Sequence, residues 1–255
     1  MTVERVNILG VGLSALNREL AVREIIGAAQ QKRKGYVCVT GVHGVMESYD
    51  DPEVRRVHNG ALYCTPDGMP MVWLLRQAGH KEADRVYGPD LMLWLCEAAA
   101  KAGLRHFFYG GANGVAVELT QKLRQRFPAM QIAGTYEPPF RRLNPEEEQQ
   151  LIETVRAAKP DLFWVGLSTP KQDKFMAEYI HKLDATIMLG VGAAFDIHAG
   201  RVQQAPYWIQ RSGFEWFFRM CMEPRRLWKR YMYNNPRFIY HVLRQRLGLE
   251  KFPAP

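Results

Sequence analysis

The sequence has few cysteines, no metal-binding spacing and no long hydrophobic run. Its four cysteines, Cys38, Cys64, Cys96 and Cys221, form no CxxC pair and follow no secretory leader. We therefore expect reduced core cysteines of a cytoplasmic protein. The seven histidines make no HxxxH or HExxH spacing and no DxD occurs, so no metal site is predicted. No apolar run approaches the roughly 18 residues that cross a bilayer, which predicts a soluble or peripheral protein.

Acidic residues are scarce at the C-terminal end. Residues 201–255 hold 11 Lys and Arg against 3 Asp and Glu, whereas residues 1–200 hold 23 of each kind. The whole net charge of +8 therefore lies in this tail, together with 12 of the 29 aromatic residues. Apolar and cationic character together predict contact with an anionic membrane surface. The alternative is a helical hairpin that packs on the core.

Short apolar runs alternate with helical patterns along the first 205 residues. Strands are predicted at residues 6–9, 36–39, 61–64, 106–109, 131–135, 161–166 and 186–190, and helices at 17–32, 45–57, 71–77, 89–102 and up to Phe127. This alternation predicts an α/β fold, a Rossmann-like parallel-sheet domain over residues 1–205. Residues 206–255 should form a helical, basic-aromatic appendage, which Pro224 and Pro236 should divide into three short helices.

The most informative stretch runs from residue 159 to 200 and reads as strand, turn, helix, strand. Ligands of parallel sheets sit beyond the carboxyl ends of the strands, so the turns at 167–172 and 190–196 should share a site. Pro170 should open the helix and leave Gln172 at its positive end, where an anion is favoured. In the second turn, Gly190 and Gly192 allow close approach of a ligand and Asp196 supplies a carboxylate. The alternative is that the glycines serve packing and that Asp196 caps a helix.

Two glycine-rich stretches resemble phosphate-binding turns. Gly10, Gly12 and Ala15 match the GxGxxA dinucleotide fingerprint, but the second predicted strand ends in Thr40 and Gly41 instead of an acidic residue that would hold a ribose. A nicotinamide oxidoreductase is therefore disfavoured, although binding of NAD but not UDP would reopen it. Residues 110–114, GGANG, follow a predicted strand and open a helix, an arrangement that offers backbone N–H groups to phosphate.

Single polar residues follow other predicted strands. Asp67 lies between Pro66 and Gly68 at a strand end, poised at the crevice, although a bare PDG is also typical of a turn aspartate. Residues 40–43 follow the second strand and should reach the same edge of the sheet. Arg85 precedes a predicted helix and is placed to reach a phosphate; a surface ion pair with Asp84 or Asp90 is an equally good interpretation.

Five motifs occur in an order that covers nearly the whole chain. They are TPDGMP at 65–70, RVYGPDLM at 85–92, VGLSTPKQDKF at 165–175, GVGAAFDIHAG at 190–200 and the tail pattern EW…R…EPRRLWKRY. In these motifs the chain resembles the WecG/TagA/CpsF glycosyltransferases, glycosyltransferase family 26. The resemblance implies a metal-independent, inverting transfer of a sugar from a UDP donor to a polyprenyl-diphosphate-linked sugar at the cytoplasmic membrane face. It also implies a Rossmann-like domain whose C-terminal appendage binds membrane and helps close the active site.

The resemblance implies roles for the residues named above. Asp67 matches the general base that acts on the acceptor hydroxyl, and inversion needs one such base. Thr40, Arg85 and Gln172 match polar positions that line the pocket. The turn with Gly190, Gly192 and Asp196 should hold the nucleotide. No cofactor besides the donor substrate is implied, and cations should neutralise the departing diphosphate; the candidates are Arg219, Arg226 and Arg230.

One departure from the family pattern concerns the donor. Members often show T-x-N after the second strand, whereas this chain has Thr40, Gly41, Val42 and His43. Val42 has no side-chain hydrogen bond to offer an acetamido group, so another UDP-hexose such as UDP-glucose is favoured over UDP-N-acetylmannosamine, and His43 takes the polar role.

Two other classes compete with a transferase. A nucleic-acid-binding protein would use the basic, aromatic tail for phosphate contact and base stacking, but the neutral first 200 residues argue against it. A structural adaptor predicts that Asp67→Ala changes nothing. The sequence leaves the oligomeric state open, a homo-oligomer included.

Overall fold

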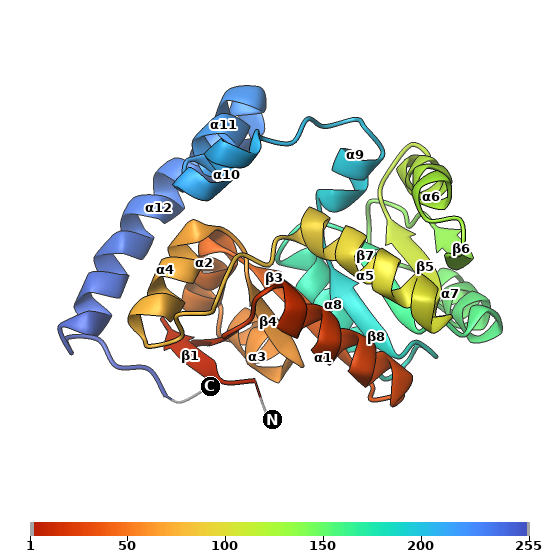
Figure 1. The fold of residues 1–255 in the computed structure, drawn as a ribbon, viewed down its shortest axis with the longest axis horizontal. Helices are drawn as coiled ribbons and strands as arrows, with labels where there is room; N and C mark the ends of the chain where they lie inside the picture. Colours follow the sequence, from red (N-terminus) through yellow and green to blue (C-terminus); the bar gives the residue numbers. More distant parts are fainter. Residues whose placement is uncertain (1–2, 254–255) are drawn as a thin grey trace. The chain divides into compact units, whose positions relative to one another are not determined.

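The computed structural model describes residues 3–253 (Figure 1). The chain forms two compact units. Unit 1 comprises Met1–Asn17, Val39–Tyr87 and Gln204–Pro255, and unit 2 comprises Arg18–Cys38 and Gly88–Gln203. Unit 1 thus takes in the tail and two earlier segments of the chain. The sequence predicts a catalytic domain over residues 1–205 and a membrane-associating appendage over residues 206–255, and this division stays a prediction.

One six-stranded sheet carries the fold. Its strand order is β4-β3-β8-β7-β5-β6. These strands are β3 (Gly35–Thr40), β4 (Tyr63–Pro66), β5 (Arg105–Gly110), β6 (Gln131–Tyr136), β7 (Leu162–Gly166) and β8 (Ile187–Gly190). The pairs β3–β8, β8–β7, β7–β5 and β5–β6 are all parallel, which confirms the predicted α/β class. The central strands are buried on both faces and therefore read in the sequence as continuous apolar runs.

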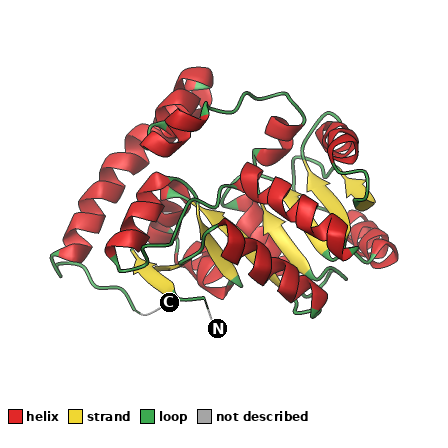
Figure 2. Cartoon of the chain, viewed as in Figure 1, coloured by secondary structure: helices red, strands yellow, loops and turns green. Residues whose placement is uncertain are grey.

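Helices flank the strands of unit 2, as the red and yellow elements of Figure 2 show. They are α1 (Arg18–Gln30), α5 (Gly88–Ala102), α6 (Val115–Arg126), α7 (Pro145–Ala158), α8 (Lys171–Tyr179) and α9 (Ala194–His198). Asn144 begins α7 through a capping box with Glu147. Helix α8 connects β7 to its parallel neighbour β8, which confirms the predicted strand-helix-strand segment.

Stacked aromatic rings form the core of unit 2. The rings of Phe107 and Phe163 lie 5.3 Å apart across β5 and β7, and those of Phe108 and Trp164 lie 6.2 Å apart. Trp164 donates its indole N–H to Nδ1 of His106 at 3.0 Å. Burial lowers the pKa of His106 to about 3, so this imidazole is neutral in the folded protein at neutral pH.

The first strand of the chain does not join the parallel sheet. In unit 1, β1 (Arg5–Ile8) pairs antiparallel with β2 (Val11–Ser14). The GxGxxA match therefore lies on a hairpin, with Gly10 at its turn (φ 89°), instead of between a strand and a helix. A dinucleotide-binding turn needs a helix N-terminus behind the glycines, so this arrangement does not form one.

A single helix was expected over residues 45–57, and the structure has two. Helix α2 (Val42–Asp50) ends before Asp51, whose carboxylate accepts the N–H of Glu53 at 2.8 Å and caps α3 (Pro52–Gly60). An N-cap aspartate followed by proline is a strong start signal, which explains the break. Helix α4 (Met69–Gln77) follows β4 in the same unit.

The tail forms α10 (Tyr207–Ser212), α11 (Glu215–Met222) and α12 (Pro224–Arg246), the blue helices of Figure 1. The prediction that Pro236 ends a helix is wrong, because α12 continues through it. Pro236 is exposed, so solvent can hydrogen-bond to the carbonyl that the proline leaves unpaired. The face of α12 with Leu227, Phe238 and Val242 is buried, and α12 packs beside α2.

The cysteines and the hydrophobic segments agree in part with the sequence. All four cysteines are free; Cys38, Cys64 and Cys96 are buried, but Cys221 is exposed on α11, so the expectation of a core position is wrong for that residue. Within residues 3–253, no helix has the length and apolar character that a membrane span requires.

Candidate active site

Asp67 is the first residue after β4 and is half-buried. Its backbone N–H donates to the carbonyl of Thr40 at 3.0 Å. Gly41 has no room for a side chain here, because a Cβ would lie 2.9 Å from the carbonyl oxygen of Asp67. The ends of β3 and β4 therefore lie together, as expected. Thr40 is fully buried and its Oγ1 lies 3.0 Å from Sγ of Cys64, so its side chain points into the interior.

Arg85 is buried rather than exposed. Its guanidinium donates to Oε1 of Gln210 at 2.6 Å, forms an ion pair with Glu215 and lies 3.9 Å from the centre of the Tyr87 ring. The predicted surface ion pair with Asp84 or Asp90 is wrong. A residue of the tail, Glu215 at the start of α11, is the carboxylate that pairs with Arg85. A phosphate contact of Arg85 stays a prediction.

Asp67 lies within electrostatic reach of this buried pair. Burial raises the pKa of Glu215; Arg85 opposes that rise and Asp67 adds to it. Burial lowers the pKa of Arg219, but Tyr231, Tyr87, Asp67 and Glu215 outweigh it, so the pKa of Arg219 is raised overall. Arg219 therefore stays charged beside two carboxylates. We call the group Asp67, Arg85, Tyr87, Gln210, Glu215, Arg219 and Tyr231 the Asp67 cluster.

The remaining candidates of unit 1 lie on α2 and α12. His43, on the first turn of α2, has its Nδ1 at 3.2 Å from the amide nitrogen of Asn234. Arg226 is exposed and pairs with Glu223 at 2.6 Å, so its charge is partly compensated on its own helix. Burial lowers the pKa of Arg230, Tyr231 opposes the shift, and Arg226 and Arg219 add to it.

Most exposed large apolar side chains of the chain lie in the tail. Thirteen of the sixteen found among the described residues do so: Tyr207, Trp208, Phe214, Phe217, Met222, Trp228, Met232, Tyr233, Ile239, Tyr240, Leu243, Leu247 and Leu249. Exposed apolar residues of this density mark an interaction surface. Leu227 and Phe238 of the same segment are buried instead.

The two turns of unit 2 lie against each other, as predicted. A Cβ on Gly192 would be 3.1 Å from the carbonyl oxygen of Leu167, and one on Gly190 would be 3.2 Å from the amide of Gln172. Gln172 is buried near the start of α8; its Nε2 donates to Oγ1 of Thr169 at 3.3 Å, and its Oε1 has no hydrogen-bond partner among the described residues. Lys171, not Pro170, is the first residue of α8.

The GGANG turn already holds an anion from its own chain. The backbone N–H groups of Asn113 and Gly114 donate to the two carboxylate oxygens of Glu137 at 2.7 and 2.9 Å. The expected phosphate contact would have to displace this carboxylate. Arg201 braces the same turn through the carbonyls of residues 112 and 113 and pairs with Glu118 at 2.8 Å, while Asp196 contributes to the raised pKa of Arg201.

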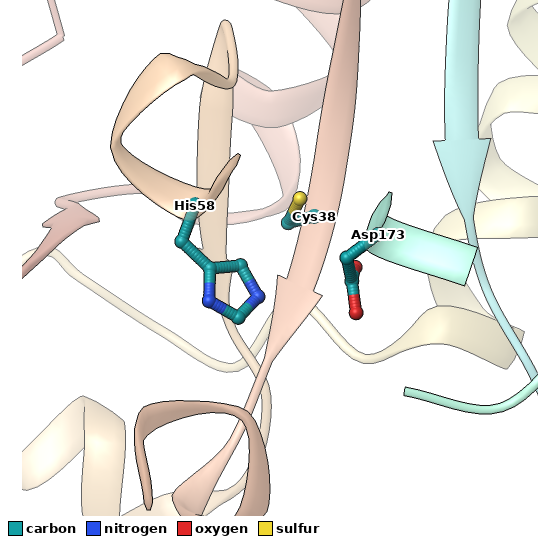
Figure 3. A group of neighbouring side chains, drawn as sticks. All are labelled: Cys38, His58 and Asp173. Atoms are coloured by element: carbon teal, nitrogen blue, oxygen red, sulfur yellow. The ribbon is translucent and has the colours of Figure 1, made fainter. Parts of the chain in front are cut away.

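Figure 3 draws three neighbouring side chains of metal-binding types, Cys38, His58 and Asp173. Cys38 on β3 and Asp173 on α8 belong to unit 2, where their ligand atoms lie within 4.8 Å of one another. His58 on α3 belongs to unit 1, where Nδ1 contacts Oγ of Ser48.

Sequence reasoning missed several members of the Asp67 cluster. Tyr87, Glu215 and Tyr231 lie within the quoted motifs but were given no role, and Gln210 and Asn234 lie outside those motifs. One signal was available: Glu215 is one of only three acidic residues in the tail, and it opens the tail motif. A lone acid in a strongly basic segment indicates a specific ion pair.

A parallel sheet with polar residues and small-residue turns after the carboxyl ends of its strands is the arrangement of an α/β enzyme. The chain belongs to the WecG/TagA/CpsF family of glycosyl transferases, whose family model matches residues 6–252. It is therefore a glycosyltransferase.

Two curated relatives bear the same name, N-acetylglucosaminyldiphosphoundecaprenol N-acetyl-beta-D-mannosaminyltransferase. The protein from Bacillus spizizenii is 29% identical over 214 residues, which are 84% of this chain and 80% of the relative. The protein from Bacillus subtilis is 30% identical over 206 residues, 80% of this chain and 78% of the relative.

Proposed function

We propose that the protein transfers a hexose from a UDP-sugar to a polyprenyl-diphosphate-linked saccharide, in the synthesis of exopolysaccharide or another envelope polysaccharide. The Asp67 cluster carries this proposal, because it combines a half-buried carboxylate at a strand end with Arg219, a charged group that interacts electrostatically with that carboxylate. The names of both relatives support it, since each describes transfer to a diphosphoundecaprenol-linked sugar.

In the proposed mechanism Asp67 accepts the proton of the acceptor hydroxyl. The hydroxyl oxygen forms a bond to the anomeric carbon while the bond from that carbon to the UDP oxygen breaks on the opposite face, which inverts the configuration. The leaving UDP gains negative charge, and cations must stabilise it. Arg219 is the strongest candidate of the three tail arginines, because it is half-buried and interacts electrostatically with Asp67, whereas Arg226 is exposed and paired with Glu223.

Two observations bear on the identity of the donor sugar. Both relatives transfer N-acetylmannosamine, according to their names. This chain has Val42 at the first position of α2, which favours a hexose without an acetamido group, such as glucose. We therefore propose UDP-glucose as the donor. An assay must compare it with UDP-N-acetylmannosamine.

The tail is proposed to rest on the inner face of the plasma membrane. Its exposed aromatic and aliphatic side chains lie among eleven basic residues at 201–255. This combination suits a surface of anionic lipid, where each basic residue contributes on the order of 1 kcal/mol. Peripheral attachment of this kind would bring the enzyme to a lipid-linked acceptor.

The test is a transfer assay with purified protein, a polyprenyl-diphosphate-linked N-acetylglucosamine and each UDP-sugar, with and without EDTA. The expected product carries one added hexose with inverted anomeric configuration, and its rate is unchanged by EDTA. UDP-N-acetylmannosamine as the best donor would refute the preference for glucose but keep the transferase. Failure of every UDP-sugar to transfer, together with binding of NAD in calorimetric titration, would refute the whole proposal.

A further inference from the structure

An open hollow lies in unit 1 beside the Asp67 cluster, with a volume of about 630 Å³. Two helices form it, α2 from one side and α12 from the other. Its lining residues are His43, Glu47, Trp228, Lys229, Arg230, Met232, Tyr233 and Asn234. Most of the lining surface is apolar, and the size is in the range of small-molecule sites.

The hollow combines an apolar wall with two cations. Trp228, Met232 and Tyr233 are 55%, 46% and 60% exposed, although they are large apolar residues. Lys229 and Arg230 stand next to them on α12. The polar floor is already satisfied in part, because Asn234 contacts His43. A ligand that fits must therefore be apolar over most of its surface and anionic at one place.

The lining of the hollow carries more positive than negative charge, with Lys229 and Arg230 against Glu47. Arg230 pairs with no carboxylate among residues 3–253, and Glu47 is the one acidic group of the hollow's lining. Burial and the neighbouring Arg226 and Arg219 lower the pKa of Arg230, so an added anion would be favoured there. Tyr231, the next residue of α12, belongs to the Asp67 cluster, and both Arg230 and Asp67 act on its pKa.

We propose that this hollow binds the diphosphate and the first isoprene units of the lipid-linked acceptor, with Lys229 and Arg230 on the diphosphate and Trp228, Met232 and Tyr233 along the prenyl chain. This inference rests on the proposed function. A prenyl diphosphate places a doubly charged group next to a single apolar chain, which matches the two cations and the one apolar wall. The rest of a long chain would continue over the exposed apolar residues of α12 and so toward the membrane.

The occupant is a prenyl diphosphate rather than a bulk phospholipid, for two reasons. A phospholipid headgroup carries one phosphate and two acyl chains, whereas the hollow offers two adjacent cations and one wall. Arg230 of the hollow also directly precedes Tyr231 of the Asp67 cluster, which suits the acceptor, since the hydroxyl that Asp67 would deprotonate belongs to the sugar on that same diphosphate.

The test is binding of farnesyl diphosphate to the protein, measured by calorimetry and by the change in tryptophan fluorescence. The hollow variant is Lys229→Gln/Met232→Gln. Its control is Arg225→Gln/Leu243→Gln, which makes the same two chemical changes at exposed positions of α12 outside the hollow. Farnesyl diphosphate should bind the hollow variant at least tenfold more weakly, the effect of losing one charge-assisted hydrogen bond and one apolar contact. The control should change less than about twofold, and UDP affinity should be unchanged in both.

Three results would overturn the inference. Equal weakening in the control would assign binding to the tail in general. Inorganic diphosphate that binds as tightly as farnesyl diphosphate would remove the role of the apolar wall. Anionic vesicles that compete with farnesyl diphosphate as well as unlabelled farnesyl diphosphate does would assign the hollow to bulk lipid. The proposed function is scored separately by the transfer assay: transfer by the hollow variant at the wild-type KM for the lipid acceptor would refute this site and leave the transferase intact.

Discussion

The two units of the chain bury very different groups. In unit 2 the core contains stacked rings on β5 and β7 and the neutral, buried His106. The buried Asp161 of unit 2 pairs with Lys32, whose side chain is 70% exposed. In unit 1 both members of an ion pair are largely buried, Arg85 and Glu215, whose side chains are 4% and 12% exposed. Aromatic packing stabilises a fold at little electrostatic cost, whereas a buried ion pair is often no more stable than an apolar substitute.

This difference indicates where the chemistry lies. A buried ion pair beside a half-buried carboxylate is destabilising unless something else requires it, and perturbed groups gather at functional sites. Glu215 comes from the tail and Arg85 from the segment before α5, so the pair also fixes α11 to the rest of unit 1. Unit 2 contributes strand-end turns whose glycines serve packing as well as access.

The strongest test of this comparison is Asp67→Asn. We expect the turnover number to fall by about two to four orders of magnitude, because the general base is lost, while the affinity for UDP stays nearly the same. Steady-state rates and UDP titration measure the two quantities. Asp184→Asn, an exposed aspartate of unit 2, is the control and should match the wild type. Equal loss of UDP binding in Asp67→Asn would make Asp67 a structural residue.

The next largest effect is expected for the ion pair of unit 1. Glu215→Gln leaves the Arg85 charge buried without its carboxylate, so the free energy of unfolding should fall by about 3 to 5 kcal/mol. Urea unfolding measures it. The double variant Arg85→Met/Glu215→Gln should recover much of this loss, since no uncompensated charge remains.

An exposed pair of unit 2 provides the matched control. Glu118→Gln breaks the pair with Arg201, where the carboxylate side chain is 47% exposed, and should change stability by less than about 1 kcal/mol. A larger effect in unit 2 than in unit 1 would reverse the comparison between the units.

Much of the fold could be predicted because its signals are local. Each strand of the parallel sheet is a short apolar run that ends near glycine or proline. The start of α7 is marked by Asn144 and by Glu147 three residues later. The strand-end position of Asp67 followed from the same signals. The first strand was assigned to the wrong kind of pairing because parallel and antiparallel partners produce similar apolar runs.

The rest depends on contacts between distant residues. Arg85 meets Glu215 at a separation of 130 residues and Gln210 at 125, and no local pattern specifies either partner. Glu137 reaches the GGANG turn from beyond the next strand. The continuity of α12 through Pro236 depends on that residue being exposed, which only the packing of Leu227 and Phe238 decides. The candidate site residues could thus be chosen by type and position, whereas their partners could not.

A smaller effect is expected for the pH dependence of the unfolding free energy, through His106 of unit 2. The folded-state pKa of His106 is lowered to about 3, so the folded protein disfavours the proton that the unfolded chain takes up near pH 6.5. Stability is therefore full above pH 6.5 and is lost as the pH falls from there toward 3. At pH 5 the loss from this one group is about 2 kcal/mol. In His106→Asn, which keeps an acceptor for the Trp164 N–H, the difference in unfolding free energy between pH 8 and pH 5 should shrink by about that amount. An unchanged difference would show that His106 is not the acid-sensitive group of unit 2.

The smallest effect concerns single charges on the tail. Arg225→Gln removes one exposed positive charge from α12, and its affinity for anionic vesicles should fall by about 1 kcal/mol, roughly fivefold, because one Coulombic contact with lipid is lost. Arg124→Gln removes an equally exposed charge from α6 in unit 2 and should leave vesicle binding unchanged. Co-sedimentation at low and at high salt measures both, and the gap between them should close as salt screens the attraction. Equal losses for the two variants would mean that net charge alone brings the protein to the membrane. The tail would then not be the membrane-binding surface.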